Sequence, residues 1–275
     1  MHDKITAIYC FIDDILKSIC YSEDQRRRVS DAELITTAIV SARYFSGHHQ
    51  HAISFMKGSG LIPQMLDKSR FCRRLHKLGA LIYGLFMQIG FYLKEVCCYM
   101  EYVLDSFPVA VCDNMRISRS KIIKGKKWRG YTASMRRYFY GVKVQLLITK
   151  DGIPVEFCFV PGSEGDPSAL QRLPFAILPE SEVYGDNGYT NYEMEDVFFE
   201  QELIRLKIQR RSNTVNRKDS TSAAYIKEMM RKQVETTIST IKALFPRKIH
   251  AVTFAGFLLK IMLFIFATQI RMVIN

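Results

Sequence analysis

The sequence predicts an α/β protein in two parts. Residues 1–97 form an all-helical domain, and residues 98–275 form a mixed five-stranded sheet with flanking helices. Three observations support this division. Apolar residues recur at helical spacing in the first part, the spacing changes to period two and to short apolar runs near residue 100, and Lys150-Asp-Gly152 has the composition of a hairpin turn. A chain of 275 residues can bury a core of this size.

The first domain contains two helical patterns. Ser30-Asp-Ala-Glu33 is a capping box that opens an apolar-periodic run, and a second pattern covers about residues 69–96. The first turns of the second pattern are basic, and Arg73 and Arg74 there suggest a helix-turn-helix-like contact with DNA. The alternative is a helical bundle with a solvated basic face.

The second domain reads as a strand, a hairpin of two strands, and then helices alternating with strands. The predicted ranges are 102–105, 138–149, 153–160, 166–177 (helix), 183–186, 192–201 (helix) and 203–208. Two helices follow, and the last of them, at residues 251–274, is strongly apolar. Because Lys260 stands in its middle, a buried core helix is favoured over a membrane span.

Charge and cysteine usage limit the partners and the compartment. The net charge of +12 predicts a polyanionic partner, with nucleic acid first and an anionic membrane surface second. Seven cysteines without a Cys-x-x-Cys motif, and no signal peptide, indicate a reduced cytoplasmic protein. His48, His49 and His51 are expected in a loop, without the neighbours that a metal site needs.

Three acids stand out by position. Asp105 and Asp186 are expected to end two strands, and Glu235 lies on the helix after the last strand. Carboxylates that meet at strand ends suit hard divalent cations such as Mg²⁺, and two such ions can drive a phosphoryl displacement. Two other acids compete for a place: Asp113 could replace Asp105 or sit close behind it, and Asp166 reads as a helix N-cap.

The helix with Glu235 carries two cations on the same side. Arg231 lies one turn before Glu235 and Lys242 two turns after it, so that all three project in nearly the same direction. This arrangement suits work on a metal-bound phosphate. Taken alone, it is also the pattern of a solvated charge stripe.

Several motifs at these positions resemble one family. They are Asp105-Ser-Phe-Pro, Tyr140-Gly-Val-Lys143, Gly152-Ile-Pro, Tyr184-Gly-Asp186-Asn-Gly-Tyr189 and Arg231-x3-Glu235-x6-Lys242. Together they resemble the DDE transposases of bacterial insertion sequences, in the group with a Tyr-x2-Arg-x3-Glu-x6-Lys signature. The resemblance covers residues 100–275, and the signature's tyrosine position falls on Glu228.

The resemblance implies an RNase H-like fold, Mg²⁺ or Mn²⁺ as cofactor, and cutting and joining of DNA at element ends. Asp105, Asp186 and Glu235 would be the metal ligands, and Arg231 and Lys242 would contact the DNA end. It also implies at least a dimer on DNA and a location with the bacterial nucleoid in the cytoplasm.

A basic insertion between the first two strands, near residues 116–137, contains no acid and is interleaved with aromatic residues. A second basic loop follows the last strand. The candidate DNA contacts are Arg116, Lys126, Lys127, Trp128, Arg129, Arg136 and Arg137 in the insertion, and Arg210 and Arg211 in the loop.

The leading hypothesis is a transposase that uses two metal ions. The alternatives are a metal-dependent nuclease of the same fold without strand transfer, and a non-catalytic basic protein that binds DNA or a membrane.

Overall fold

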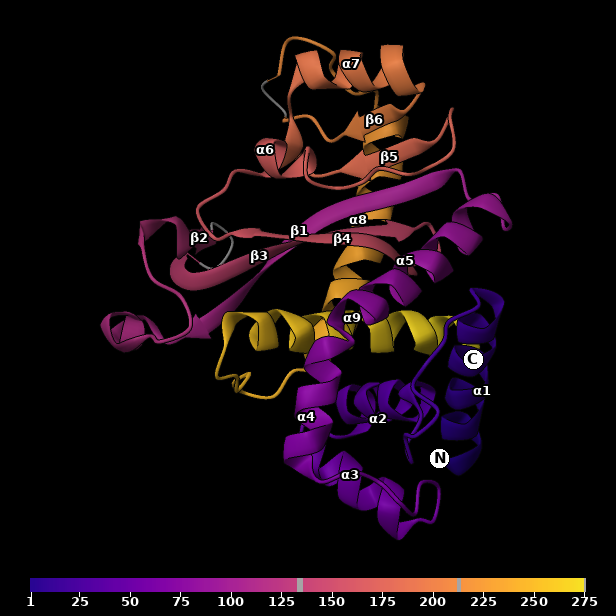
Figure 1. Ribbon diagram of the computed structural model, residues 1–275. Coiled ribbons are helices and arrows are strands. Elements are labelled where there is room, and N and C mark those ends of the chain that lie inside the picture. Colours follow the sequence, from indigo (N-terminus) through magenta and orange to yellow (C-terminus); the bar gives the residue numbers. More distant parts are fainter. Residues whose placement is uncertain (133–135, 212–213, 275) are drawn as a thin grey trace. The chain divides into compact units, whose positions relative to one another are not determined.

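The computed structural model describes residues 1–132, 136–211 and 214–274. Figure 1 follows the chain through two compact units. One unit consists of Met1–Phe86 together with Ile241–Asn275, and the other of Met87–Thr240. The division therefore differs from a single boundary at residue 97, because the C-terminal helix packs among the N-terminal helices.

The helical unit is built around two buried helices. Its elements are α1 His2–Ser18, α2 Asp31–Tyr44, α3 His49–Gly58, α4 Lys68–Lys77, the start of α5 Gly79–Glu95, and α9 Phe254–Ile274. α2 and α9 form its centre, and the predicted capping box opens α2: the Glu33 N–H donates to Ser30 Oγ (3.0 Å) and the Ser30 N–H to Glu33 Oε2 (2.7 Å). Two predictions were wrong here. The pattern at 69–96 is two helices, because α4 ends at Lys77 and α5 begins at Gly79, and the His49 and His51 positions lie in α3 rather than in a loop.

α9 is a core helix of this unit. Among the residues that the structure describes, it alone is long and apolar enough to cross a membrane, yet 67% of its most apolar window is buried. Two of its buried polar side chains donate hydrogen bonds within the unit: Thr268 Oγ1 to the Phe264 carbonyl (3.0 Å) and Gln269 Nε2 to the Phe86 carbonyl (3.1 Å). Burial of the helix together with these internal hydrogen bonds is typical of a core helix.

The second unit contains a mixed sheet. Its strands are β1 Glu101–Cys112, β2 Arg129–Thr132, β3 Arg137–Thr149, β4 Pro154–Pro161, β5 Glu182–Gly185 and β6 Arg205–Ile208. β3 pairs antiparallel with β1 and β4, whereas β5 is parallel to both β1 and β6. The order β4-β3-β1-β5-β6 is the RNase H-like order that the resemblance implied. The extra strand, β2, pairs with the start of β3 and escaped prediction because its four residues, Arg-Gly-Tyr-Thr, carry no apolar alternation.

Three helices complete this unit: α6 Asp166–Leu170, α7 Tyr192–Glu202 and α8 Thr221–Ala243. α8 passes behind the strands in the view of Figure 1. Thr237 Oγ1 of α8 donates to the Gly152 carbonyl (2.9 Å). Gly152 has φ +88°, and a Cβ there would lie 2.7 Å from Gln233 Nε2 and 2.9 Å from Thr237 Oγ1. The hairpin turn therefore requires glycine both for its backbone and for the approach of α8.

α8 packs against the sheet through an apolar stripe. Met230, Val234 and Ile238 are buried, but Ile226 near its start is exposed. A buried ion pair holds α5 against the hairpin close to the same turn, where Lys94 Nζ of α5 donates to Glu156 Oε1 of β4 (2.6 Å). These contacts fix α5 and α8 on the sheet that carries the site.

Candidate active site

Asp105 lies inside β1 and not at its end. β1 continues to Cys112 because its antiparallel pairing with β3 extends that far, so the predicted strand end at residue 105 was wrong. The parallel pairing of β1 with β5, however, stops at Leu104 opposite Gly185. Asp105 and Asp186 are the next residues on the two neighbouring strands, and they meet where the parallel register ends.

The surroundings of Asp105 disfavour its charged form. Burial raises the pKa of this carboxyl to about 6, and the negative charges of Asp186 and Asp166 add to the rise. The Ser106 N–H, which donates to Asp105 Oδ1 (2.7 Å), and the charge of Arg231 act in the opposite direction. Because the charged form of Asp105 is unfavourable here, a bound cation would stabilise it.

Arg231 of α8 connects the other two acids. Its Nη1 donates to Asp186 Oδ1 (3.3 Å) and its Nε to Glu235 Oε1 (3.0 Å). Asp186 is half-buried and also accepts from the Asn187 N–H (2.7 Å), whereas Glu235 is exposed. The guanidinium thus compensates two carboxylates that face the same side of the sheet.

A cleft of about 10 Å³ lies between β1, β5 and α8. Asp105, Asp186, Lys227 and Arg231 contribute polar groups to it. A volume of this order holds about one water molecule or a small ion. The donor set of Asp105 and Asp186 therefore fits a hard divalent cation, although within the described parts of the chain no three acids, histidines or cysteines are grouped as metal ligands.

A second polar cluster supports the strand next to Asp105. Asp166 Oδ1 accepts from Lys143 Nζ (2.9 Å), Ser106 Oγ (3.1 Å) and Gln145 Nε2 (3.3 Å), and Gln145 Oε1 accepts from the buried Tyr189 hydroxyl (2.5 Å). Gly165, and not Asp166, is the N-cap of α6, so the predicted capping role was wrong. Sequence reasoning missed this cluster, although lysine and glutamine two residues apart in a buried strand were a signal for it.

Asp113 lies far from the site. It follows the last residue of β1 and is exposed. At about 3.3 Å per strand residue, its Cα lies about 25 Å along the strand from that of Asp105. The structure therefore does not bring Asp113 together with Asp105 and Asp186.

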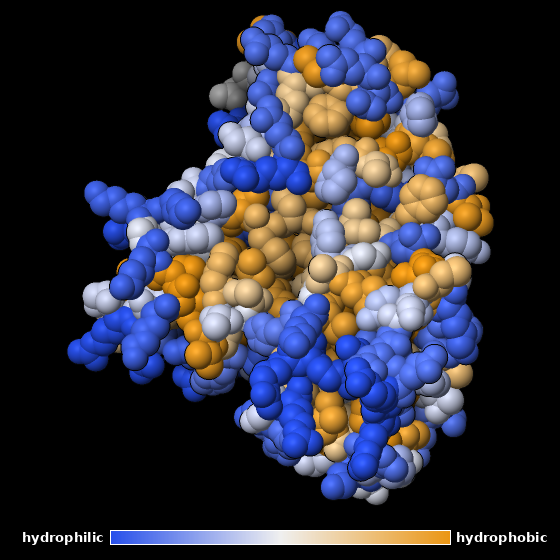
Figure 2. Space-filling view, in the orientation of Figure 1, coloured by the Kyte–Doolittle hydropathy of each residue, from blue (hydrophilic) through white to orange (hydrophobic). Residues whose placement is uncertain are grey.

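The basic insertion is exposed and carries stacked cation–aromatic pairs. The Arg129 guanidinium lies 4.8 Å from the Tyr138 ring centre and Lys127 Nζ 5.2 Å from that of Trp128. Figure 2 shows a mostly hydrophilic surface over the projection around β2, on the left. Residues 133–135 lie outside the described part of the insertion. All the cations predicted to contact DNA in the insertion are exposed: Arg116, Lys126, Lys127, Arg129, Arg136 and Arg137.

Two of the other predicted DNA contacts serve the fold. Arg74 pairs with the buried Asp31 and donates to the Val29 carbonyl (2.7 Å), and Arg210 forms a two-bond ion pair with buried Glu195. Arg73, Arg211 and Lys242 are exposed, the last of these in the final turn of α8.

Residues 96–250, which are more than half of the chain, match the model of a protein family described as Transposase DDE domain. This chain belongs to that family. The match runs from before β1 to beyond α8 and includes Asp105, Asp186 and Glu235. No curated protein and no solved structure gave a match. As a DDE transposase, the protein has DNA as its partner, and its family generally uses divalent metal ions.

Proposed function

We propose that this DDE transposase cuts the ends of an insertion sequence and joins the resulting 3′-hydroxyls to target DNA. The observation that carries the proposal is the meeting of Asp105 and Asp186 at the end of the parallel register, with Glu235 linked to Asp186 through Arg231. An oxygen-rich site beside a guanidinium suits phosphoryl transfer without a covalent nucleophile.

Asp105, Asp186 and Glu235 would hold Mg²⁺ or Mn²⁺. When bound, these ions activate a water or 3′-hydroxyl and stabilise the leaving oxygen. Asp105 has to be deprotonated to serve as a ligand, and Arg231 has to exchange a carboxylate for a DNA phosphate. Its planar guanidinium suits both partners, because carboxylate and phosphate accept the same pair of parallel hydrogen bonds.

DNA would lie along the exposed cations of the insertion. Lys126, Arg129 and Arg136 would neutralise phosphates, while Trp128 and Tyr138 offer rings to bases or sugars. We also propose DNA contacts for Arg73, Arg211 and Lys242. We no longer propose them for Arg74 and Arg210, because these two side chains form ion pairs within the protein. Pairing of two element ends requires at least a dimer on DNA, in the bacterial cytoplasm.

The test is a reaction of the full chain with a plasmid that carries its gene together with the flanking DNA. With Mg²⁺, a transposase yields cut ends and products joined to a second plasmid. A nuclease of the same fold yields cut ends alone, and a non-catalytic DNA-binding protein yields neither.

Glu235→Gln should abolish both cutting and joining, because it removes one carboxylate charge at constant size. Asp113→Asn is the matched control, since it makes the same kind of change outside the site and should leave both steps intact. Full joining by Glu235→Gln, or its loss in Asp113→Asn, would reject the assignment of the acids.

A further inference from the structure

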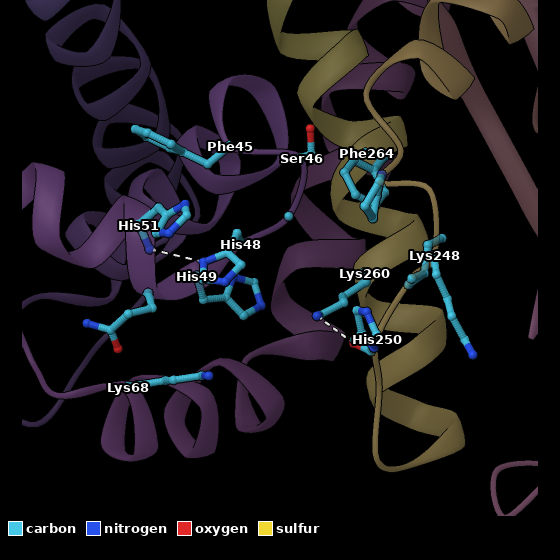
Figure 3. Close-up of a pocket in the computed structure, with 14 residues that line it drawn as sticks. Phe45, Ser46, His48, His49, His51, Lys68, Lys248, His250, Lys260 and Phe264 are labelled. Atoms are coloured by element: carbon cyan, nitrogen blue, oxygen red, sulfur yellow. Dashed lines mark hydrogen bonds between the residues drawn. The ribbon is translucent and has the colours of Figure 1, made fainter.

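The helical unit contains a basic cavity of about 510 Å³ that the active-site assignment does not use. We call it the histidine cavity and define it by six of its lining residues: His48, His49, His51, Lys68, His250 and Lys260. These residues come from α3, α4, the segment before α9, and α9 itself. Figure 3 shows Lys68 and Lys260 directed toward the space beside His48 and His49.

A second cavity, of about 750 Å³, adjoins the first and shares His49, Lys68, His250 and Lys260 with it. It adds Arg73, His76 and Lys77. Five of the chain's six histidines line the two cavities. Among the described residues that line them there is no aspartate or glutamate. The positive charge of the lining residues is therefore not balanced by a carboxylate within the cavities.

The contacts within the cavity keep its cations in place. Lys260 Nζ donates to the His250 carbonyl (2.6 Å), and the rings of His48 and His51 stack with their centres 3.8 Å apart. His48 Nδ1 accepts from the His51 N–H (3.3 Å) and so caps α3. Buried His49 contacts Ser41 Oγ through Nδ1 (3.0 Å), and its pKa is lowered to about 4 by burial, so that it stays neutral.

The neighbouring cations suppress each other's charge. Burial, followed by the nearby charge of Lys68, lowers the pKa of Lys260. Burial, followed by the charges of His51 and Lys68, lowers the pKa of His48. An anion bound among these groups would relieve the repulsion, whereas a metal cation would add to it. The cavity is therefore suited to an anion.

We propose that the histidine cavity is a phosphate site that takes the sugar–phosphate backbone of DNA. The inference rests on the proposed function for the choice of DNA as the source of the phosphate. Two adjoining basic cavities match a ligand with several phosphates in succession, as duplex DNA presents. A free nucleotide fits less well, because the residues that line the cavities include no carboxylate that could accept hydrogen bonds from its sugar hydroxyls.

His48 makes this site sensitive to pH. Burial lowers the pKa of His48 below its ordinary value, so its ring gains a proton only in acid, where it adds positive charge that faces the phosphate. The charged and titratable groups around it are His49 and His51 of α3, Lys68, Arg73, His76 and Lys77 of α4, Lys248 and His250 of the segment before α9, and Lys260 of α9. DNA should therefore bind more tightly at about pH 5 than at about pH 8.

The experiment measures binding of the full chain to a short fluorescent duplex of mixed sequence, in EDTA, over a series of salt concentrations. Lys68→Gln should weaken binding and lower the log–log salt slope by about 0.9, as expected for one lost phosphate contact. The matched control is Lys57→Gln, because Lys57 is an exposed lysine of α3 outside both cavities and should change nothing. Equal effects of the two substitutions, or no effect of Lys68→Gln, would overturn the proposal.

Two further arms identify the ligand. His48→Asn keeps a side chain that can cap α3 but removes the titrating ring, and it should reduce the gain in affinity at about pH 5. Inorganic phosphate, added at constant ionic strength, should compete with DNA for the wild type but less for Lys68→Gln. If phosphate binding depends on Lys68 while DNA binding does not, the site takes a small phosphorylated ligand and the DNA proposal is rejected.

Binding in EDTA does not require strand cutting. Normal plasmid cutting without an effect of Lys68→Gln on binding would reject the cavity alone. Lys68-dependent DNA binding by a protein that never cuts DNA would reject the proposed function alone.

Discussion

Replacing Asp105 with asparagine should stabilise the folded protein at neutral pH while it removes metal-dependent cutting. The carboxylate is held in a partly buried position beside two other acids, so folding has to pay for its charge. Asparagine has nearly the same size and can still accept the hydrogen bond from the Ser106 N–H. The substitution therefore removes the repulsion without leaving a cavity.

The magnitude follows from the pKa of this group. A rise from 3.8 to about 6 corresponds to about 3 kcal/mol, at roughly 1.4 kcal/mol per pH unit. Because solvent reaches part of the side chain and screens its charge, we expect about 1–2 kcal/mol. For a chain of this size, each kcal/mol moves the midpoint of thermal unfolding by about 2–4 °C.

The assay is thermal unfolding in EDTA over a pH series. Since the folded pKa lies above the unfolded one, the folded state binds more protons between about pH 4 and pH 6, and stability falls as pH rises through that window. The advantage of Asp105→Asn should be absent below about pH 4 and complete above about pH 6. Asp113→Asn, at an exposed acid, should follow the wild type at every pH.

An equal or lower midpoint for Asp105→Asn at neutral pH would refute this reasoning. An advantage that did not depend on pH would refute it as well, because the gain would then come from packing and not from charge.

Four other single substitutions, one of them with a compensating second change, test the fold and the DNA surface. Gly152→Ala should cost about 1–3 kcal/mol of unfolding free energy in urea, because the residue has positive φ and contacts α8. Lys94→Met should cost about 3–5 kcal/mol by leaving Glu156 buried and unpaired, and a second change, Glu156→Leu, should restore much of it. Arg210→Met should destabilise by a similar amount, whereas Arg211→Met should keep stability and lower the salt slope of DNA binding by about 0.9. Unfolding curves identical to the wild type for Gly152→Ala, Lys94→Met or Arg210→Met would contradict these contacts.

The sequence carried enough information to identify most strands, and the family resemblance implied their order in the sheet. Hydrophobic period and the turn at Gly152 are local signals for the strands, whereas the RNase H-like order rests on the family motifs. The length of β1 was not predictable in the same way, because Asp105, Ser106 and Pro108 interrupt its apolar alternation. Pairing with β3 maintains the strand through these residues, and that contact is absent from any short window of sequence.

Side-chain partners were the least predictable part of the site. Arg73 and Arg74 look alike in sequence, yet only the second meets the buried Asp31. Arg210 and Arg211 differ in the same way, because strand β6 ends just before them and turns the first toward α7. Periodicity predicts which face of an element a residue occupies. It does not predict whether a carboxylate from a distant part of the sequence lies against that face.

The measurement that most directly tests the central claim is mapping of the bound metal with Fe²⁺. Fe²⁺ that replaces Mg²⁺ generates hydroxyl radicals in the presence of ascorbate and peroxide, and these cut the protein backbone next to the ion. We expect cuts near Asp105, Asp186 and Glu235 that excess Mg²⁺ suppresses, that Asp186→Asn abolishes, and that Asp113→Asn leaves unchanged. Cuts at other positions, or cuts at these positions that survive in Asp186→Asn, would contradict the assignment of these acids as metal ligands.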